Sequence, residues 1–261
     1  MEPAVAVSTD HRPGVVTVTM NRPGEHNALN DQLIEELTGA FHSLADQEDV
    51  RVIILTGNGR SFCAGADLKN TKAVAEAGFD RALAIGHAIF DLMCAVDSCP
   101  IPVIARVNGS AIGGGMGLVC SSDIAVTVGR AKFGFSEVRL GLMPAVISPF
   151  VLAKIGASKV RELFLTGERF DANQASEIGL VHWVVPEDQL DEKVAERAEQ
   201  LLLGAPGAQS AVKLLLKEFI SLPADEARSF TSDLFARRIV SDEGREGISA
   251  FLEKRKPDWI D

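Results

Sequence analysis

Short runs of β-branched and aliphatic residues alternate with segments of helical periodicity through the first two thirds of the chain. The runs Val15–Met20, Val52–Thr56 and Val103–Val107 predict strands. Two more strands are expected at Ile124–Val128 and Leu180–Val185. The run at Val52–Thr56 is almost wholly apolar, which is typical of a strand that is buried on both faces of a sheet.

The segments between these strands predict amphipathic helices. Asn30 has a side chain suited to an N-cap, and a helix is expected to follow it. The apolar face of that helix comprises Leu33, Leu37, Phe41 and Leu44. A second helix, which ends before Pro100, has Ile85, Ile89, Leu92 and Met93 on one face. Strands that alternate with helices in this way predict an α/β fold.

The pattern changes near residue 188, where strand signals end. Four charged amphipathic segments follow, Leu190–Leu203, Ala208–Ile220, Ala224–Ile239 and Glu246–Lys254. We therefore predict a core at 1–187 and a helical C-terminal region at 188–261. The apolar side chains of this region include Leu214, Phe219, Phe230, Leu234 and Phe251. Short helices without a sheet must bury such side chains elsewhere, which predicts contact with another subunit.

Composition and charge narrow the class of protein. The 261 residues are 46% hydrophobic and 24% charged, as in soluble globular proteins. The net charge of −10 disfavours non-specific binding to nucleic acid or to an anionic membrane. The longest stretch without a charged residue, Val107–Ser122, is shorter than the roughly 20 residues of a membrane-spanning helix.

Residues 1–14 include Glu2, Asp10 and Arg12 and lack the apolar core of a signal peptide. With four cysteines at no metal-binding spacing, this predicts a cytoplasmic protein with free thiols. The glycine cluster Gly113–Gly117 lacks the third glycine of a dinucleotide-binding motif, because Leu118 or Cys120 stands there. No metal or separate cofactor is therefore expected.

Two segments rich in small residues carry the candidate chemistry. Phe62–Leu68 follows one predicted strand and Asn108–Gly115 follows another. Small residues allow another molecule to approach the backbone, and a helix predicted over Gly114–Ser122 would begin with unpaired N–H groups. Two such N–H groups from separate loops can form an oxyanion hole. Considered singly, each segment is more simply explained as a tight turn that packs closely.

Together, these segments resemble the enoyl-CoA hydratase/isomerase superfamily, also called the crotonase family. The resemblance spans nearly the whole chain. Its motifs are Asn21-Arg22-Pro23, Asn27-Ala28-Leu29, Ala64–Lys69, Gly113–Gly115, Phe133–Glu137, Gly141–Pro144, Leu165–Glu168 and Arg245–Lys256. The resemblance implies a spiral of β-β-α units followed by a helical trimerisation region. It also implies a trimer or a dimer of trimers, and an acyl-CoA thioester as substrate, with coenzyme A present only as part of that substrate.

The resemblance assigns roles to individual residues. It places the two oxyanion-hole N–H groups at Ala66 and Gly114 and an acid/base carboxylate at Glu137. The residues that it implies around coenzyme A are Ala64, Asp67 and Leu68 at the adenine end, Lys69 near the phosphates, and Phe235 and Lys254 from the helical region.

The chain departs from the family at one position. Typical family hydratases carry a second glutamate where this chain has Gly117, also expected to line the substrate site. Glycine cannot orient or deprotonate water, so Glu137 would act alone. The leading hypothesis is a single-glutamate enoyl-CoA hydratase. The alternatives are a Δ3-Δ2 enoyl-CoA isomerase that uses the same glutamate, a lyase-type member, and a non-catalytic acyl-CoA-binding paralogue.

The segment Ser136–Pro149 is similar to a bacterial branch of hydratases for methylglutaconyl-CoA and related branched substrates. This similarity implies a role in fatty acid or branched-chain amino acid degradation. A glutamate introduced at position 117 is expected to restore the water-orienting carboxylate, because its spacing to Glu137 matches that of two-glutamate members.

Overall fold

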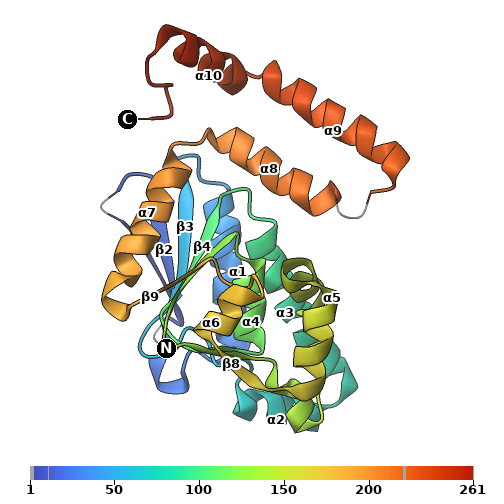
Figure 1. Ribbon diagram of the computed structural model, residues 1–261. Coiled ribbons are helices and arrows are strands. Elements are labelled where there is room, and N and C mark those ends of the chain that lie inside the picture. The colour runs from blue at the N-terminus through green and yellow to red at the C-terminus, as the bar shows by residue number, and fades with distance from the viewer. Residues whose placement is uncertain (1–2, 11, 220–221, 261) are drawn as a thin grey trace.

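A six-stranded sheet in the order β1-β2-β3-β4-β6-β9 forms the centre of the computed structural model, which describes residues 3–10, 12–219 and 222–260 (Figure 1). Its strands are β1 (Val5–Thr9), β2 (Val15–Met20), β3 (Val52–Gly57), β4 (Val103–Val107), β6 (Ile124–Val128) and β9 (Trp183–Val185). Only the β1–β2 pair is antiparallel among these neighbours. A second sheet contains β5 (Ala111–Ile112), β7 (Lys132–Gly134) and β8 (Arg169–Asp171).

Helices connect these strands. They are α1 (Asp31–Ala45), α2 (Leu68–Ala77), α3 (Phe79–Asp97), α4 (Gly114–Ser121), α5 (Ser148–Thr166) and α6 (Ala172–Glu177), with 3-10 helices η1 (Pro23–Glu25), η2 (Ser136–Leu140) and η3 (Glu187–Gln189). The side chain of Asn30 caps α1 by accepting a hydrogen bond from the backbone N–H of Leu33 (3.0 Å). All four apolar residues predicted for the α1 face are buried, which confirms the expected packing.

The predicted strand at Leu180–Val185 is shorter in the structure. The backbone N–H groups of Leu180 and Val181 both donate to the carbonyl of Ala175, so these two residues close the turn after α6 instead of extending β9. His182 precedes β9, and its Nδ1 accepts a hydrogen bond from the backbone N–H of Ala125 (3.0 Å). Its role is therefore structural.

The C-terminal region is helical, but its first helix belongs to the core. Leu190, Val194 and Ala198 of α7 (Leu190–Leu202) are buried against the sheet. The helices α8 (Pro206–Phe219), α9 (Ala224–Ile239) and α10 (Asp242–Glu253) project from the body of the molecule (Figure 1), and we call them the C-terminal module. The expected last residue of the second segment, Ile220, lies outside the described residues.

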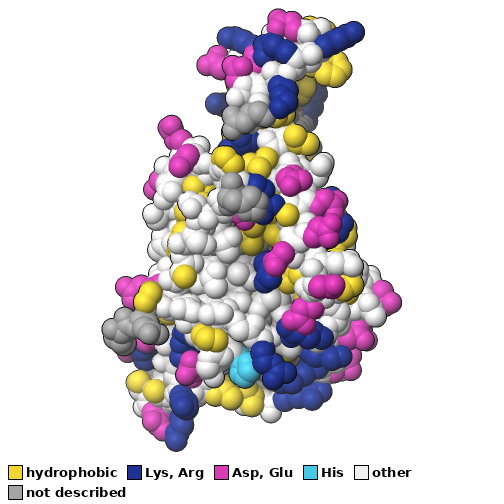
Figure 2. Space-filling view, turned by 90° about the vertical axis from the view of Figure 1, so that its left-hand side faces the viewer, with side chains coloured by type: hydrophobic (Ala, Val, Ile, Leu, Met, Phe, Trp, Pro, Cys, Tyr) yellow, Lys and Arg dark blue, Asp and Glu magenta, His cyan; other side chains and the backbone are white. Residues whose placement is uncertain are grey.

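Polar contacts join α8 of the C-terminal module to the core. Lys213 of α8 donates to the carboxylate of Asp123, which also accepts from the backbone N–H of Val103 (2.7 Å) at the start of β4. Large apolar side chains of the module remain exposed, including Val212, Leu216, Phe219, Phe235, Phe251 and Leu252. Figure 2 shows the module projecting beyond the body, with hydrophobic side chains where the two meet.

The cysteines are free thiols, as predicted. Burial raises the pKa of Cys63 and of Cys120 to about 12, so both stay protonated and unreactive near neutral pH. In the part of the chain that the structure describes, no helix has the length and apolar character needed to span a membrane.

Candidate active site

The two small-residue loops lie side by side. The backbone N–H groups of Phe62 and Cys63 donate to the carbonyl of Ser110 (3.1 and 3.2 Å). The N–H of Ile112 donates to the carbonyl of Cys63 (3.0 Å). These bonds join the loop after β3 to the loop after β4, so that the start of α4 lies beside residues 65–67.

Glycine is required where these loops touch. A Cβ at Gly65, whose φ is +88°, would lie 2.7 Å from the carbonyl oxygen of Ile112. A Cβ at Gly115 would lie 2.4 Å from the carbonyl oxygen of Cys63. Close packing therefore explains these two glycines, and the same packing brings the backbones of Ala66 and Gly114 near one another.

The backbone N–H groups of Ala66 and Gly114 have no hydrogen-bond acceptor among the described residues. Ala66 lies between two residues that both pair with Leu29. The carbonyl of Gly65 accepts from the N–H of Leu29, and the N–H of Asp67 donates to the carbonyl of Leu29. Gly114 is the first residue of α4, where N–H groups have no partner within the helix. Two free donors on adjacent loops are what an oxyanion hole requires.

The carboxylate of Glu137 covers the start of α4. Its Oε1 lies 2.8 Å from the position that a Cβ on Gly113 would take. Its Oε2 is buried and has no hydrogen-bond partner in the described part of the chain. Burial raises the pKa of Glu137 above its ordinary value. A buried carboxylate oxygen without a partner thus lies against Gly113, the residue before the free N–H donor of Gly114. Such an oxygen is suited to bind a water molecule or a substrate proton.

Position 117 does not face open space. A Cβ on Gly117 would lie 2.6 Å from Cγ2 of Ile147 and 2.8 Å from Sδ of Met93. Gly117 is itself buried, and the predicted contact between this residue and the substrate stays a prediction. The expectation that Gly117→Glu restores a water-orienting carboxylate stays a prediction, and these contacts mean that Ile147 or Met93 would have to move to make room for the new side chain. Sequence reasoning missed Ile147 and Met93, because neither lies near position 117 in the chain.

One of the residues predicted to contact coenzyme A at the loop after β3 already has partners within the fold. Asp67 caps α2 by accepting from the N–H groups of Lys69 (3.0 Å) and Asn70 (3.3 Å), and it pairs with Arg22 (3.1 Å). Burial opposes ionisation of Asp67, but these hydrogen bonds outweigh it and lower its pKa. Asp67 therefore shapes the loop. The residues left exposed around it are Ala64, Ala66, Leu68 and Lys69.

Arg22 belongs to the motif Asn21-Arg22-Pro23, and the sequence alone assigns it no role. Its guanidinium bridges the η1 loop and the Asp67 loop, because it also donates to the carbonyl of Ala28. It thereby helps to fix the segment that presents the Ala66 N–H.

Phe235 and Lys254 lie in the C-terminal module. Phe235 is 68% exposed on α9, and Lys254 follows the last residue of α10. The module stands at the opposite end of the molecule from α2 (Figure 1). Within one chain these two residues therefore lie far from α2 and the loop before it, and their contacts with coenzyme A stay a prediction.

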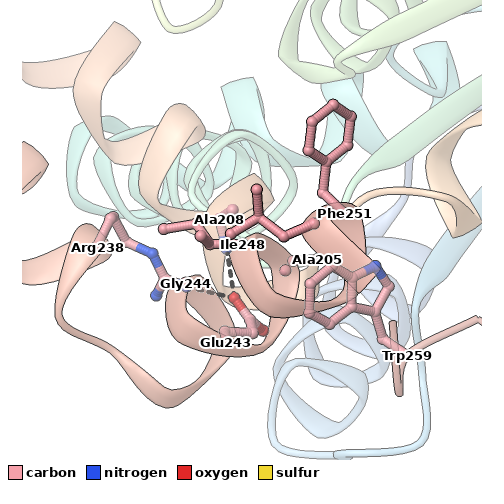
Figure 3. Close-up of a pocket in the computed structure, with 10 residues that line it drawn as sticks. Ala205, Ala208, Arg238, Glu243, Gly244, Ile248, Phe251 and Trp259 are labelled. Carbon is pink, nitrogen blue, oxygen red and sulfur yellow. Dashed lines mark hydrogen bonds and ion pairs between the residues drawn. The ribbon is translucent and has the colours of Figure 1, made fainter. Parts of the chain in front are cut away.

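The module contains a pocket of its own between α8 and α10 (Figure 3). Its walls include Ala208, Ile248 and Trp259. Glu243 lies at one side, paired with Arg238, and accepts from the N–H groups of the first turn of α8. Since Glu243 already has these partners, it caps a helix, and the pocket holds none of the residues predicted for catalysis.

Comparison with known proteins gives a consistent result. A family model described as enoyl-CoA hydratase/isomerase matches residues 10–261. A probable enoyl-CoA hydratase, echA8, of Mycobacterium tuberculosis is 34% identical over 98% of this chain and 97% of its own. The 2,3-dehydroadipyl-CoA hydratase of Escherichia coli is 34% identical, with 94% of each chain covered.

Solved structures agree in fold. An enoyl-CoA hydratase from Shewanella pealeana superposes with a TM-score of 0.93 at 37% identity, over 98% of this chain and 96% of its own. Pseudomonas aeruginosa AtuE superposes with a TM-score of 0.95 at 35% identity, over 99% and 100%.

Proposed function

The chain belongs to the enoyl-CoA hydratase/isomerase superfamily and has the crotonase fold, and from this premise we propose that it adds water to the 2,3 double bond of an enoyl-CoA thioester. The relatives named probable enoyl-CoA hydratase and 2,3-dehydroadipyl-CoA hydratase support this activity. The observation that carries the proposal is the buried, unpartnered Oε2 of Glu137, whose carboxylate lies against Gly113, the residue before the free N–H of Gly114.

The oxyanion hole would act on the thioester carbonyl. When the N–H groups of Ala66 and Gly114 donate to the carbonyl oxygen, they polarise the conjugated double bond. As the water oxygen bonds to C3, an electron pair moves through C2 to the carbonyl oxygen and forms an enolate. Donors fixed by the backbone stabilise that charge without having to reorient, which lowers the barrier.

Glu137 would move the protons. Its carboxylate takes one proton from water while the water oxygen bonds to C3. The resulting carboxylic acid gives a proton to C2 as the carbonyl reforms, so one water is added and Glu137 returns to its ionised form. A raised pKa makes the carboxylate a stronger base for the first step, and it brings the pKa nearer to neutral pH, where one group can both take and give a proton.

An enoyl-CoA isomerase is the second candidate. In that reaction one base removes a proton from C2 of a 3-enoyl-CoA and returns it at C4, while the double bond moves to the 2,3 position. The apolar enclosure of Gly117 favours this candidate, because it leaves one carboxylate and isomerisation needs only one. A branched acyl group is proposed as the preferred substrate from the resemblance carried by Ser136–Pro149.

A panel of substrates separates these possibilities. The purified protein would be assayed for hydration of crotonyl-CoA and of a branched glutaconyl-type CoA, and for isomerisation of a 3-enoyl-CoA. We expect hydration to exceed isomerisation, with the branched substrate preferred. Isomerisation faster than any hydration would instead establish the second candidate, and no turnover of any substrate would contradict both.

The pH dependence should report on Glu137. The carboxylate must be ionised to take a proton from water, so kcat/KM should fall as the pH drops through the pKa of Glu137. Because burial raises this pKa, the fall should be centred above 4.5, the ordinary glutamate value. The measurement is kcat/KM against pH for the preferred substrate, together with a check that the protein stays folded. A midpoint at or below 4.5 would contradict the assignment.

We also propose that the protein is a trimer or a dimer of trimers, joined through the C-terminal module. The exposed apolar side chains of the module support this, with Phe251 at 83% exposure. Light scattering should give a multiple of the 27.9 kDa chain mass. Phe251→Asp should shift the mass towards the monomer, whereas Leu152→Asp, a change at an exposed position on α5, should not. A wild-type mass of 27.9 kDa would refute the proposal.

A further inference from the structure

Different side chains lie against two glycines at the start of α4. Gly113 and Gly117 are four residues apart and are joined by a hydrogen bond from the N–H of Gly117 to the carbonyl of Gly113 (3.2 Å). Gly113 is the N-cap of α4, and Gly117 lies one helical turn further along the chain. The carboxylate of Glu137 covers Gly113, and the side chains of Ile147 and Met93 cover Gly117. The wall one turn from the carboxylate is therefore apolar.

We propose that Ile147 and Met93 are specificity-determining residues that restrict this site to a single carboxylate. The inference rests on the proposed function and deepens it, because it concerns how water is activated at the same site. Both side chains occupy the space into which any side chain at position 117 would extend. The atoms nearest a Cβ at position 117 belong to Ile147 and Met93, so they offer an added side chain no charged group at its base.

Ile147 is the more rigid of the two. It precedes the first residue of α5, and its carbonyl accepts from the N–H of Val151 (3.1 Å). Its β-branched side chain has few alternative rotamers, whereas Met93 is unbranched and can adjust. The segment from Glu137 to Ile147 also carries the carboxylate at its other end. One connection between β7 and α5 thus supplies both the acid/base group and the side chain that excludes a second one.

A double-mutant cycle tests this proposal. The variants are Gly117→Glu, Ile147→Gly and the two changes combined, and the assay is hydration of crotonyl-CoA. We expect Gly117→Glu alone to gain no activity and to melt at a lower temperature than the wild type. Combining it with Ile147→Gly should raise hydration at least about 10-fold over either single variant, since a second water-binding carboxylate would then fit. A folded double variant without this gain would overturn the proposal, as would a full gain from Gly117→Glu alone.

A second cycle avoids the charged side chain and keeps the test valid if the glutamate variants do not fold. Gly117→Ala should lower the melting temperature by about 3 °C or more, because its Cβ would overlap Ile147. Ile147→Ala should remove most of that loss when the two are combined. Gly39→Ala on α1 is the matched control, since nothing lies within 4 Å of its Cβ position. Equal melting temperatures for Gly117→Ala and Gly39→Ala would contradict the proposed exclusion.

The outcomes also distinguish this inference from the proposed function. If the wild type hydrates no enoyl-CoA, the proposed function fails, while the melting-temperature cycle still reports whether Ile147 closes position 117. If the wild type is an active hydratase and neither cycle shows coupling between positions 117 and 147, the inference alone fails.

Discussion

Glu137→Gln is expected to lower kcat by at least about 10²-fold, the usual loss on removing a general acid/base. Glutamine keeps the size of the side chain but cannot take a proton from water. Binding of acyl-CoA should be largely retained, because the N–H groups of Ala66 and Gly114 are backbone donors and are unchanged. The measurement is kcat and KM for the preferred substrate, with calorimetric titration of an unreactive acyl-CoA analogue.

Glu35→Gln is the matched control, because it makes the same chemical change at an exposed position on α1. Stability provides a second readout. A carboxyl whose folded-state pKa is raised destabilises the fold as the pH rises through that pKa. Glu137→Gln should therefore melt at a higher temperature than the wild type at pH 7, whereas Glu35→Gln should not. Near-normal turnover in Glu137→Gln would exclude the single-carboxylate mechanism.

The elements that the sequence predicts well are those with a strong contrast between buried and exposed positions. The bounds predicted for β2 and β4 match the structure, and α1 follows the predicted cap. β1 (Val5–Thr9) was not predicted, because it is an edge strand that leaves four of its five residues exposed and so shows no burial pattern. α5 was also missed, since a kink at Gly156 interrupts its helical periodicity.

The candidate active site also has residues that the sequence could propose and residues that it could not. The residues of the two loops suggest a close backbone approach, but only the family resemblance singles out Ala66 and Gly114 as the donors. The surroundings of Gly117 could not be proposed from the sequence, because Met93 comes from α3 and Ile147 from the segment before α5. Which side chains fill a given space depends on how distant segments of the chain pack. A local sequence pattern does not predict that packing.

Removing one oxyanion-hole donor should have a comparably large effect, and Gly114 offers a clean way to do it. Gly114 is the first residue of α4, where proline is tolerated because its missing N–H breaks no helical hydrogen bond. Gly114→Pro should therefore lower kcat by about 10² to 10³-fold, the usual loss for one such donor. Gly114→Ala is the matched control, because it adds a Cβ but keeps the N–H.

The alanine variant is expected to cost less than about 10-fold, because the added Cβ would meet mainly the tip of the flexible Leu29 side chain, at 2.6 Å. The ratio of the kcat values of the two variants then measures the contribution of the Gly114 N–H alone. The N–H interacts more strongly with the enolate oxygen than with the neutral carbonyl, so its loss should appear in kcat more than in KM. Circular dichroism and thermal melts would show that both variants are folded. Equal activity of folded Gly114→Pro and Gly114→Ala would mean that this N–H does not contact the reacting oxygen.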